Sequence, residues 1–211
     1  VCQSGSTTLT FQQGASGYTG SADTYIDAAN PGTSFATADQ LIVDLAPNVN
    51  EALLRFGNIF GAGAGQIPAG STISSATLTI NIPTTPANAP SLVAVELHRV
   101  LAAWTDSNTY STFGALPWNA PAGIQTDGVE ATSAADSTFA ANSLSTTGPH
   151  SLDVTSSLQA WAASPASNQG WVFVELTDDS ARFESSEALT PGNRPLLSVT
   201  FNPPAVGCTT N

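Results

Sequence analysis

Residues 75–82 read Ser-Ala-Thr-Leu-Thr-Ile-Asn-Ile, and this stretch decides the fold. Apolar and polar residues alternate along it from Ala76 to Ile82, so an extended chain would be apolar on one side and polar on the other. Such alternation predicts a β-strand with one face in the core and one in water. Working outward, comparable runs occur at 7–11, 23–27, 40–45, 52–56, 92–100, 170–176, 181–185 and 196–201.

Prolines and glycines separate these runs, as Pro83, Pro86 and Pro90 do after residue 82. Short alternating strands with turn signals between them predict an all-β fold, an antiparallel two-sheet sandwich. One short helix is expected at 156–163, with Thr155 as its N-cap. Trp161 in this helix and Trp171 in a strand both read as core residues.

The middle of the chain, residues 104–149, is rich in Ser, Thr, Ala and Gly and only weakly patterned. It is expected to form extended loops with one strand pair at most. An unpatterned stretch of this length in a compact domain is typical either of a functional segment or of one whose strands the pattern does not reveal. The chain shows no internal repeat and no linker, so residues 1–211 are expected to form a single domain.

Composition excludes several classes of function. The 211 residues include 16 acidic and 4 basic ones, a net charge of −12, and all four basic residues are arginine. Nucleic-acid binding needs clustered cations, and so does docking on an anionic membrane, so neither is expected. No apolar run approaches the ~18 residues of a spanning helix. An acidic surface favours cations or neutral polymers as partners.

The two cysteines, Cys2 and Cys208, lie near the two ends of the sequence. This placement predicts one disulfide that joins the termini, and hence an oxidising compartment. The chain has no Met and begins at Val1. A removed signal peptide would explain both features, so a secreted, extracellular protein is expected.

Several segments together resemble the DNRLRE domain family of secreted microbial proteins, which is similar to alginate-associated carbohydrate-binding modules. The matching segments are DTYID at 23–27, ALLRF at 52–56, IPAGSTISSATLTI at 67–80, RVLAAW at 99–104, DVTSSLQAW at 153–161 and FESSEALTPGNRPLLSVTF at 183–201. They cover about residues 20–202. The resemblance implies a jelly-roll type of sandwich, secretion, and a non-catalytic accessory or surface role.

No catalytic motif is apparent. The sequence lacks a Gly-x-Ser-x-Gly nucleophile elbow, and His98 reads as a satisfied strand residue. Glycoside hydrolysis needs a pair of carboxyl groups, and sixteen acidic residues allow many such pairs. The presence of acids is therefore no evidence for a hydrolase by itself. We therefore expect no enzyme; a polysaccharide hydrolase or lyase is the less favoured alternative.

Calcium is the metal that the residues favour, because carboxylates and loop carbonyls are its ligands. The candidate ligands are Asp23 and Asp27 first, then Asp178 and Asp179. The alternative interpretation of the acids is structural: Asp23, Glu184 or Glu187 would pair with Arg55 or Arg194.

Aromatic rings are the usual partners of sugars. Trp104, Tyr110 and Trp118 lie in the polar middle region, and Asn119 follows Trp118. These four residues are the candidate ligand contacts, with Trp118 the best exposed candidate and Trp104 favoured as a core residue. The sequence thus predicts a non-catalytic domain that binds an extracellular polysaccharide or cell-surface glycan. The alternative is a structural surface protein that associates with copies of itself.

Overall fold

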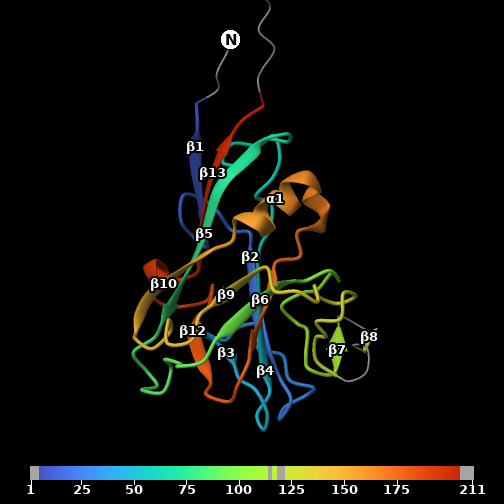
Figure 1. Cartoon of the computed structure of the whole chain (residues 1–211), viewed down its shortest axis with the longest axis vertical. Helices are drawn as coiled ribbons and strands as arrows, with labels where there is room; N and C mark the ends of the chain where they lie inside the picture. Colours follow the sequence, from blue (N-terminus) through green and yellow to red (C-terminus); the bar gives the residue numbers. More distant parts are fainter. Residues whose placement is uncertain (1–4, 114–115, 118–121, 205–211) are drawn as a thin grey trace, which may run out of the picture.

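The computed structural model of the chain describes residues 5–113, 116–117 and 122–204. Its regular structure is mainly β-strand, in two large sheets whose neighbouring strands are antiparallel (Figure 1). The four-stranded sheet has the order β1-β13-β5-β10, formed by Thr7–Gln12, Leu196–Asn202, Thr72–Ile82 and Gly148–Asp153. The five-stranded sheet has the order β2-β4-β11-β6-β9, formed by Ser21–Asp27, Asn50–Phe56, Trp171–Glu175, Val95–Arg99 and Ser137–Phe139.

Smaller elements complete the fold. Strand β3 (Gln40–Val43) pairs with β12 (Ala181–Glu184), and β7 (Thr112–Phe113) pairs with β8 (Leu116–Pro117). One α-helix, α1, spans Thr155–Ala163, and two 3₁₀ helices, η1 and η2, span Pro165–Ser167 and Pro191–Asn193.

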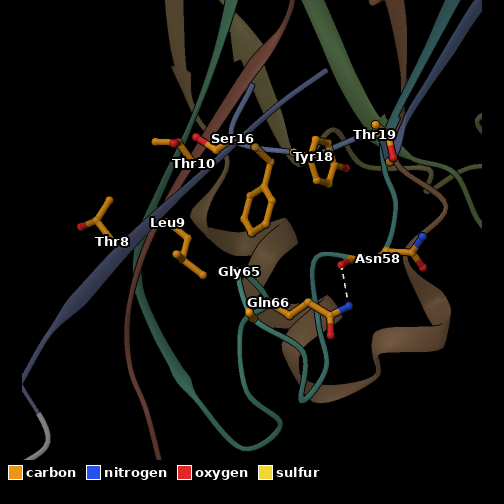
Figure 2. Close-up of a pocket in the computed structure, with 13 residues that line it drawn as sticks. Thr8, Leu9, Thr10, Ser16, Tyr18, Thr19, Asn58, Gly65 and Gln66 are labelled. Carbon is orange, nitrogen blue, oxygen red and sulfur yellow. Dashed lines mark hydrogen bonds between the residues drawn. The ribbon is translucent and has the colours of Figure 1, made fainter. Parts of the chain in front are cut away.

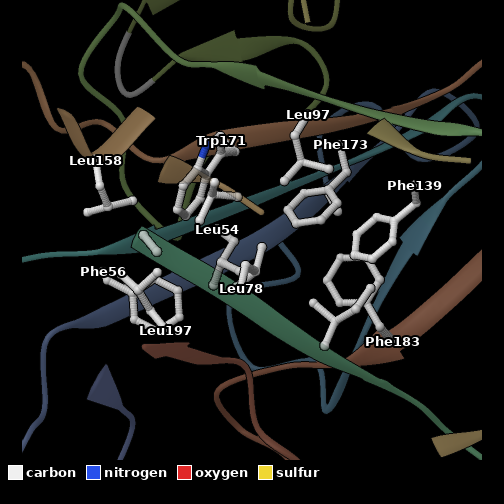
Figure 3. Packing of buried hydrophobic residues seen from close by; sticks show 14 of the residues in the cluster. Leu54, Phe56, Leu78, Leu97, Phe139, Leu158, Trp171, Phe173, Phe183 and Leu197 are labelled. Atoms are coloured by element: carbon white, nitrogen blue, oxygen red, sulfur yellow. The ribbon is translucent and has the colours of Figure 1, made fainter. Parts of the chain in front are cut away.

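The core lies between the two large sheets. Leu78 of β5 and Leu197 of β13 are fully buried on the inner face of the four-stranded sheet. They belong to one hydrophobic cluster with Leu54, Leu97 and Phe173 of the five-stranded sheet (Figure 3). Burial of this apolar area is the main favourable contribution to folding. The all-β sandwich with one short helix that the sequence predicts is confirmed.

Helix α1 packs beside β5 and adds to the core (Figure 1). The Trp161 ring lies 4.7 Å from the ring of Trp171, whose Nε1 donates a 2.9 Å hydrogen bond to Ser157 Oγ. Both tryptophans are therefore core residues, as predicted. The N-cap prediction was wrong: Thr155 lies inside the helix, and its Oγ1 accepts a hydrogen bond from the backbone N–H of Ala76.

The middle region holds more strand than the sequence indicates. Strand β9 joins the five-stranded sheet and β10 joins the four-stranded one, in addition to the short β7–β8 pair. Strand β10 begins with Gly148 and Pro149, which interrupt the alternation of apolar and polar residues by which a strand is recognised. Proline is tolerated there because β10 is an edge strand, where an N–H facing solvent is not needed.

The first and last strands are neighbours, since Thr7 of β1 pairs with Phe201 of β13. Cys2 and Cys208 lie outside the described residues. The disulfide between them therefore stays a prediction, supported by the pairing of the two terminal strands.

Candidate functional site

Several described residues between β6 and β9 pack on the outer face of the five-stranded sheet. Trp104, Ile124 and Ala131 form a second buried cluster with Leu53 and Val172 of the sheet. Part of this outer face is thus covered by the chain's own side chains.

Two of the predicted ligand contacts, Trp104 and Tyr110, belong to this second cluster or pack against it. Trp104 is 3% exposed, its Nε1 donates to the carbonyl oxygen of Gln169 at 2.7 Å, and the Arg55 guanidinium lies 5.0 Å from its ring centre. Tyr110 is half-buried and packs against the same cluster. Trp118 and Asn119 lie outside the described residues. The geometry gives Trp104 a packing role.

A groove opens at the edge of the sandwich where the chain leaves β1 and enters β2; we call it the edge groove. Its first part has a volume of about 430 Å³ and is lined by residues 8–11 of β1, the loop 16–20, Asn58 and the loop 64–66 (Figure 2). Strand β1 is the edge strand of its sheet, so one side of its backbone is not paired with a strand. An edge backbone offers N–H and C=O groups to a partner.

Two aromatic residues, Phe11 and Tyr18, line this first part, and Tyr18 is the more exposed of the two. Its ring packs edge-on against Phe11 at 5.4 Å and lies 6.5 Å from Phe56, and its hydroxyl donates to the Gly57 carbonyl oxygen at 2.9 Å. Burial raises the pKa of the Tyr18 hydroxyl, so the group stays neutral. The ring is half-buried and fixed, which suits a platform for the apolar face of a ligand.

The edge groove continues past Thr19, Gly20 and Asn58 into a second part of about 610 Å³. Asn168 and Gln169, which follow η1, line it together with Arg55 of β4. The Asn168 amide donates to the Phe56 carbonyl oxygen at 2.8 Å and accepts from the Gly170 N–H at 3.2 Å. The Gln169 Oε1 accepts from Arg55 Nη1 at 3.1 Å. These bonds hold the polar groups in fixed positions.

Some polar groups of the edge groove are left for a ligand. Among the described residues, the Asn58 side-chain amide and the hydroxyls of Ser16 and Thr19 have no hydrogen-bond partner, whereas Gln66 Nε2 is bonded to the Asn58 carbonyl oxygen at 2.9 Å (Figure 2). Arg55 is the sole charged side chain among the described residues that line either part. Its guanidinium is held by Gln169, the Trp104 carbonyl oxygen and the Trp104 ring.

The first two calcium candidates are separated in the structure. Asp23 and Asp27 are four residues apart on β2, which corresponds to about 13 Å at the usual rise of a strand. Asp27 closes a turn by accepting from the Ala29 N–H and the Asn30 amide at 2.8 and 2.7 Å. Asp23 is 2% exposed and accepts from the Ser186 N–H at 2.8 Å. Burial and the neighbouring Glu187 carboxylate raise the pKa of Asp23.

The second two candidates lie in the turn after β11. Asp179 Oδ2 accepts from the Leu92 N–H at 2.6 Å. Asp178 lies beside Asp44, whose pKa is raised mainly by burial. Within the part of the chain that the structure describes, no group of three or more His, Cys, Asp or Glu residues is arranged to hold a metal ion. Calcium binding therefore stays a prediction.

The predicted pairing of acids with Arg55 or Arg194 was wrong for the described residues. Arg194 donates to the carbonyl oxygens of Ala188 and Gln13 at 3.0 and 3.1 Å. The arginine that forms an ion pair is Arg99, whose Nε lies 2.9 Å from Asp136 Oδ1. Two of the four arginines, Arg55 and Arg194, thus donate to backbone carbonyl groups instead of pairing with an acid.

His98 is satisfied, as the sequence predicts. Its Nδ1 lies 2.7 Å from the Thr132 carbonyl oxygen and its Nε2 lies 3.2 Å from Glu96 Oε2. It is also buried, away from the edge groove.

The helices among the described residues include none with the length and apolar character needed to cross a membrane.

The fold is a β-sandwich with a groove at one edge, and the described lining of that groove is mainly polar. The model of carbohydrate-binding module family 96 matches residues 15–201, most of the chain, and the chain therefore belongs to that family. No curated protein sequence matches the chain. The protein is thus a carbohydrate-binding domain, which confirms the class that the sequence predicts, although the match does not carry the DNRLRE name.

Proposed function

We propose that the domain binds a neutral extracellular polysaccharide in the edge groove, without catalysing a reaction on it. The observation that carries the proposal is the lining of the groove. It combines the fixed Tyr18 ring with the unpaired side chains of Ser16, Thr19 and Asn58. A ring with a few polar groups around it is the usual composition of a site for a small polar ligand.

Charge supports a neutral glycan. A net charge of −12 repels a polyanion such as a polyuronate, and it repels it most at low ionic strength. The one cation of the edge groove, Arg55, is already engaged by Gln169 and by Trp104. Hydrogen bonds between uncharged groups need no compensating charge, and binding should therefore depend little on salt.

A binding role without catalysis is supported by the position of the acids. Hydrolysis of a glycosidic bond generally needs two carboxyl groups on either side of the bond. No aspartate or glutamate belongs to the described lining of the edge groove. Family membership supports the same conclusion, since the family is one of binding modules. An accessory or cell-surface role outside the cell fits such a module and the low content of charged residues.

The experiment is a binding screen with soluble neutral and uronic-acid oligosaccharides, at low and high salt. The proposal predicts binding to at least one neutral glycan, with little change between the two salt concentrations. Binding to uronic-acid glycans alone, lost in high salt, would contradict the neutral ligand. Released reducing ends would contradict the non-catalytic role. Light scattering on the same samples reports self-association, the behaviour expected of a structural surface protein.

A further inference from the structure

The outer face of the four-stranded sheet carries a regular array of hydroxyl groups. The inner positions of β5 are buried at Ala76, Leu78 and Ile80, so Ser75, Thr77 and Thr79 point outward. The neighbouring strands place further hydroxyls on the same side. We call this surface the hydroxyl face, defined by Thr8, Thr10, Ser75, Thr77, Thr79, Ser151, Ser198 and Thr200.

The strand register sets these residues in rows. Thr8, Thr200 and Ser75 are paired across β1, β13 and β5, and Thr10, Ser198 and Thr77 form the next row. Strands are spaced by about 4.8 Å, and residues on one face recur about every 6.8 Å along a strand. Two pairs are close enough to hydrogen bond, Thr8 with Thr200 at 2.9 Å and Thr79 with Ser151 at 2.8 Å.

The hydroxyl face is open and nearly uncharged. Its hydroxyl side chains are exposed or half-buried. Among the outward positions of the four strands, all of which the structure describes, Asp153 alone carries a charge. Each threonine is β-branched and therefore restricted at χ1, so its hydroxyl loses little freedom when it meets a partner. The face is thus pre-organised for many weak hydrogen bonds.

The hydroxyl face is continuous with the edge groove. Thr8 and Thr10 belong to the face and also line the groove, on the opposite side of β1 from Leu9 (Figure 2). A glycan that occupies the groove therefore lies next to the first row of hydroxyls. An open face cannot enclose one chain, however, and single neutral hydrogen bonds contribute little net free energy. Only a partner that meets many hydroxyls at once would gain from it.

We propose that the hydroxyl face adsorbs the domain to the surface of an insoluble neutral polysaccharide, in which many chains present hydroxyls together. The inference rests on the proposed function, and it adds a second surface and a physical form of the ligand. The edge groove binds a single chain, and the hydroxyl face binds the surface of a chain assembly.

The test uses the whole chain and measures depletion from solution by particles of cellulose, chitin and insoluble β-1,3-glucan. The double variant Thr77→Val/Thr200→Val keeps the β-branched shape and removes two hydroxyls. Its partition onto the particles that the wild type binds should fall about tenfold or more. The matched control is Thr138→Val on β9, an exposed strand threonine of the other sheet, which should adsorb like the wild type.

A second double variant controls for the possibility that the two exposed valines of the first change adsorption by causing aggregation. Thr77→Asp/Thr200→Asp adds no apolar surface and places charge on the face, and it should also lose adsorption. Melting curves establish that each variant is folded. Adsorption of both double variants at the wild-type level would overturn the inference.

Soluble oligosaccharides of the same sugars separate this inference from the proposed function. Both double variants should bind them like the wild type, because neither Thr77 nor Thr200 lines the edge groove. Soluble binding without any adsorption of the wild type would overturn the hydroxyl face and leave the groove standing. Absence of both would overturn the two proposals together.

Discussion

The backbone of Gly20 lies so close to Gly57 that a Cβ on Gly20 would be 2.5 Å from the Gly57 carbonyl oxygen. The same two residues are joined by a 2.7 Å hydrogen bond from the Gly57 N–H to the Gly20 carbonyl oxygen. This close contact holds together the two loops that frame the edge groove, and Tyr18 bonds to the same Gly57 carbonyl.

Gly20→Ala should therefore destabilise the domain. Forcing a methyl group against a backbone oxygen typically costs about 1–3 kcal/mol. Urea unfolding measures the loss. Gly32→Ala is the control, because a Cβ there meets no atom within 4 Å. Equal stability of the two variants would show that the contact between Gly20 and Gly57 is not tight.

Glu175 should make the domain less stable as the pH rises. Burial, with Asp44 nearby, raises its pKa to about 7, so the folded chain holds a proton that the unfolded chain releases near its ordinary pKa of about 4.3. The folded state binds more protons in this window, and stability falls between about pH 4 and pH 7. Below the window the contribution of this group is fully present.

Glu175→Gln removes this pH dependence and can keep both contacts, with Ser91 Oγ and with the Ser180 N–H. Relative to wild type, the variant should gain on the order of 3 kcal/mol between pH 4 and pH 8. Urea unfolding across that range is the measurement. Asp153→Asn is the control. Hydrogen bonds from Thr155 lower the pKa of Asp153, so this substitution should change the pH dependence of stability only below the range in which Glu175 acts. Parallel curves for wild type and Glu175→Gln would refute the account of this carboxyl group.

The sandwich could be predicted from the sequence because its strands carry their pattern locally. Strand β5 alternates from Ala76 to Ile82, and its buried residues in that stretch are the ones the alternation selects. Strand β9 was not predicted because its three residues are too few to show a pattern. Strand β10 was not predicted because Gly148 and Pro149 interrupt its alternation.

The edge groove could not be predicted in this way. Its residues come from β1, the loop 16–20, the segment 55–66 and residues 165–169, which are distant in the sequence and brought together by the fold. The available signal was Tyr18, an aromatic residue between Gly17 and Gly20 in a polar loop. Aromatic residues in the middle region drew the sequence-based prediction instead. One of them, Trp104, is used to cover a sheet.

Calcium binding is predicted to stabilise the fold. Removing a ligand that binds only the folded state lowers the melting midpoint, by several degrees for a domain of this size. The comparison is a thermal melt in millimolar calcium against one in excess EGTA. Superimposable melting curves, with no calcium detected by elemental analysis, would contradict calcium binding. The four candidate aspartates would then have only the structural contacts described above.

The disulfide between Cys2 and Cys208 is predicted to link the ends of strands that already pair. A link across so long a loop stabilises mainly by restricting the unfolded chain, by about 5 kcal/mol at most. Reduction should therefore lower the melting midpoint. Thiol titration of the denatured, unreduced protein is the direct measurement, and two reactive thiols would rule the bond out.

The central claim is that the edge groove binds the glycan, and Asn58 tests it most directly. Asn58 has a backbone φ of 56°, which glycine adopts without strain, so Asn58→Gly removes the unpaired amide and leaves the loop intact. Asn142 has a φ of 66° and lies outside the groove, so Asn142→Gly is the matched control. Calorimetric titration with a soluble neutral oligosaccharide should show about two- to tenfold weaker binding for Asn58→Gly, the loss expected for one neutral hydrogen bond, and unchanged binding for Asn142→Gly. Equal affinity of wild type and Asn58→Gly would contradict the claim.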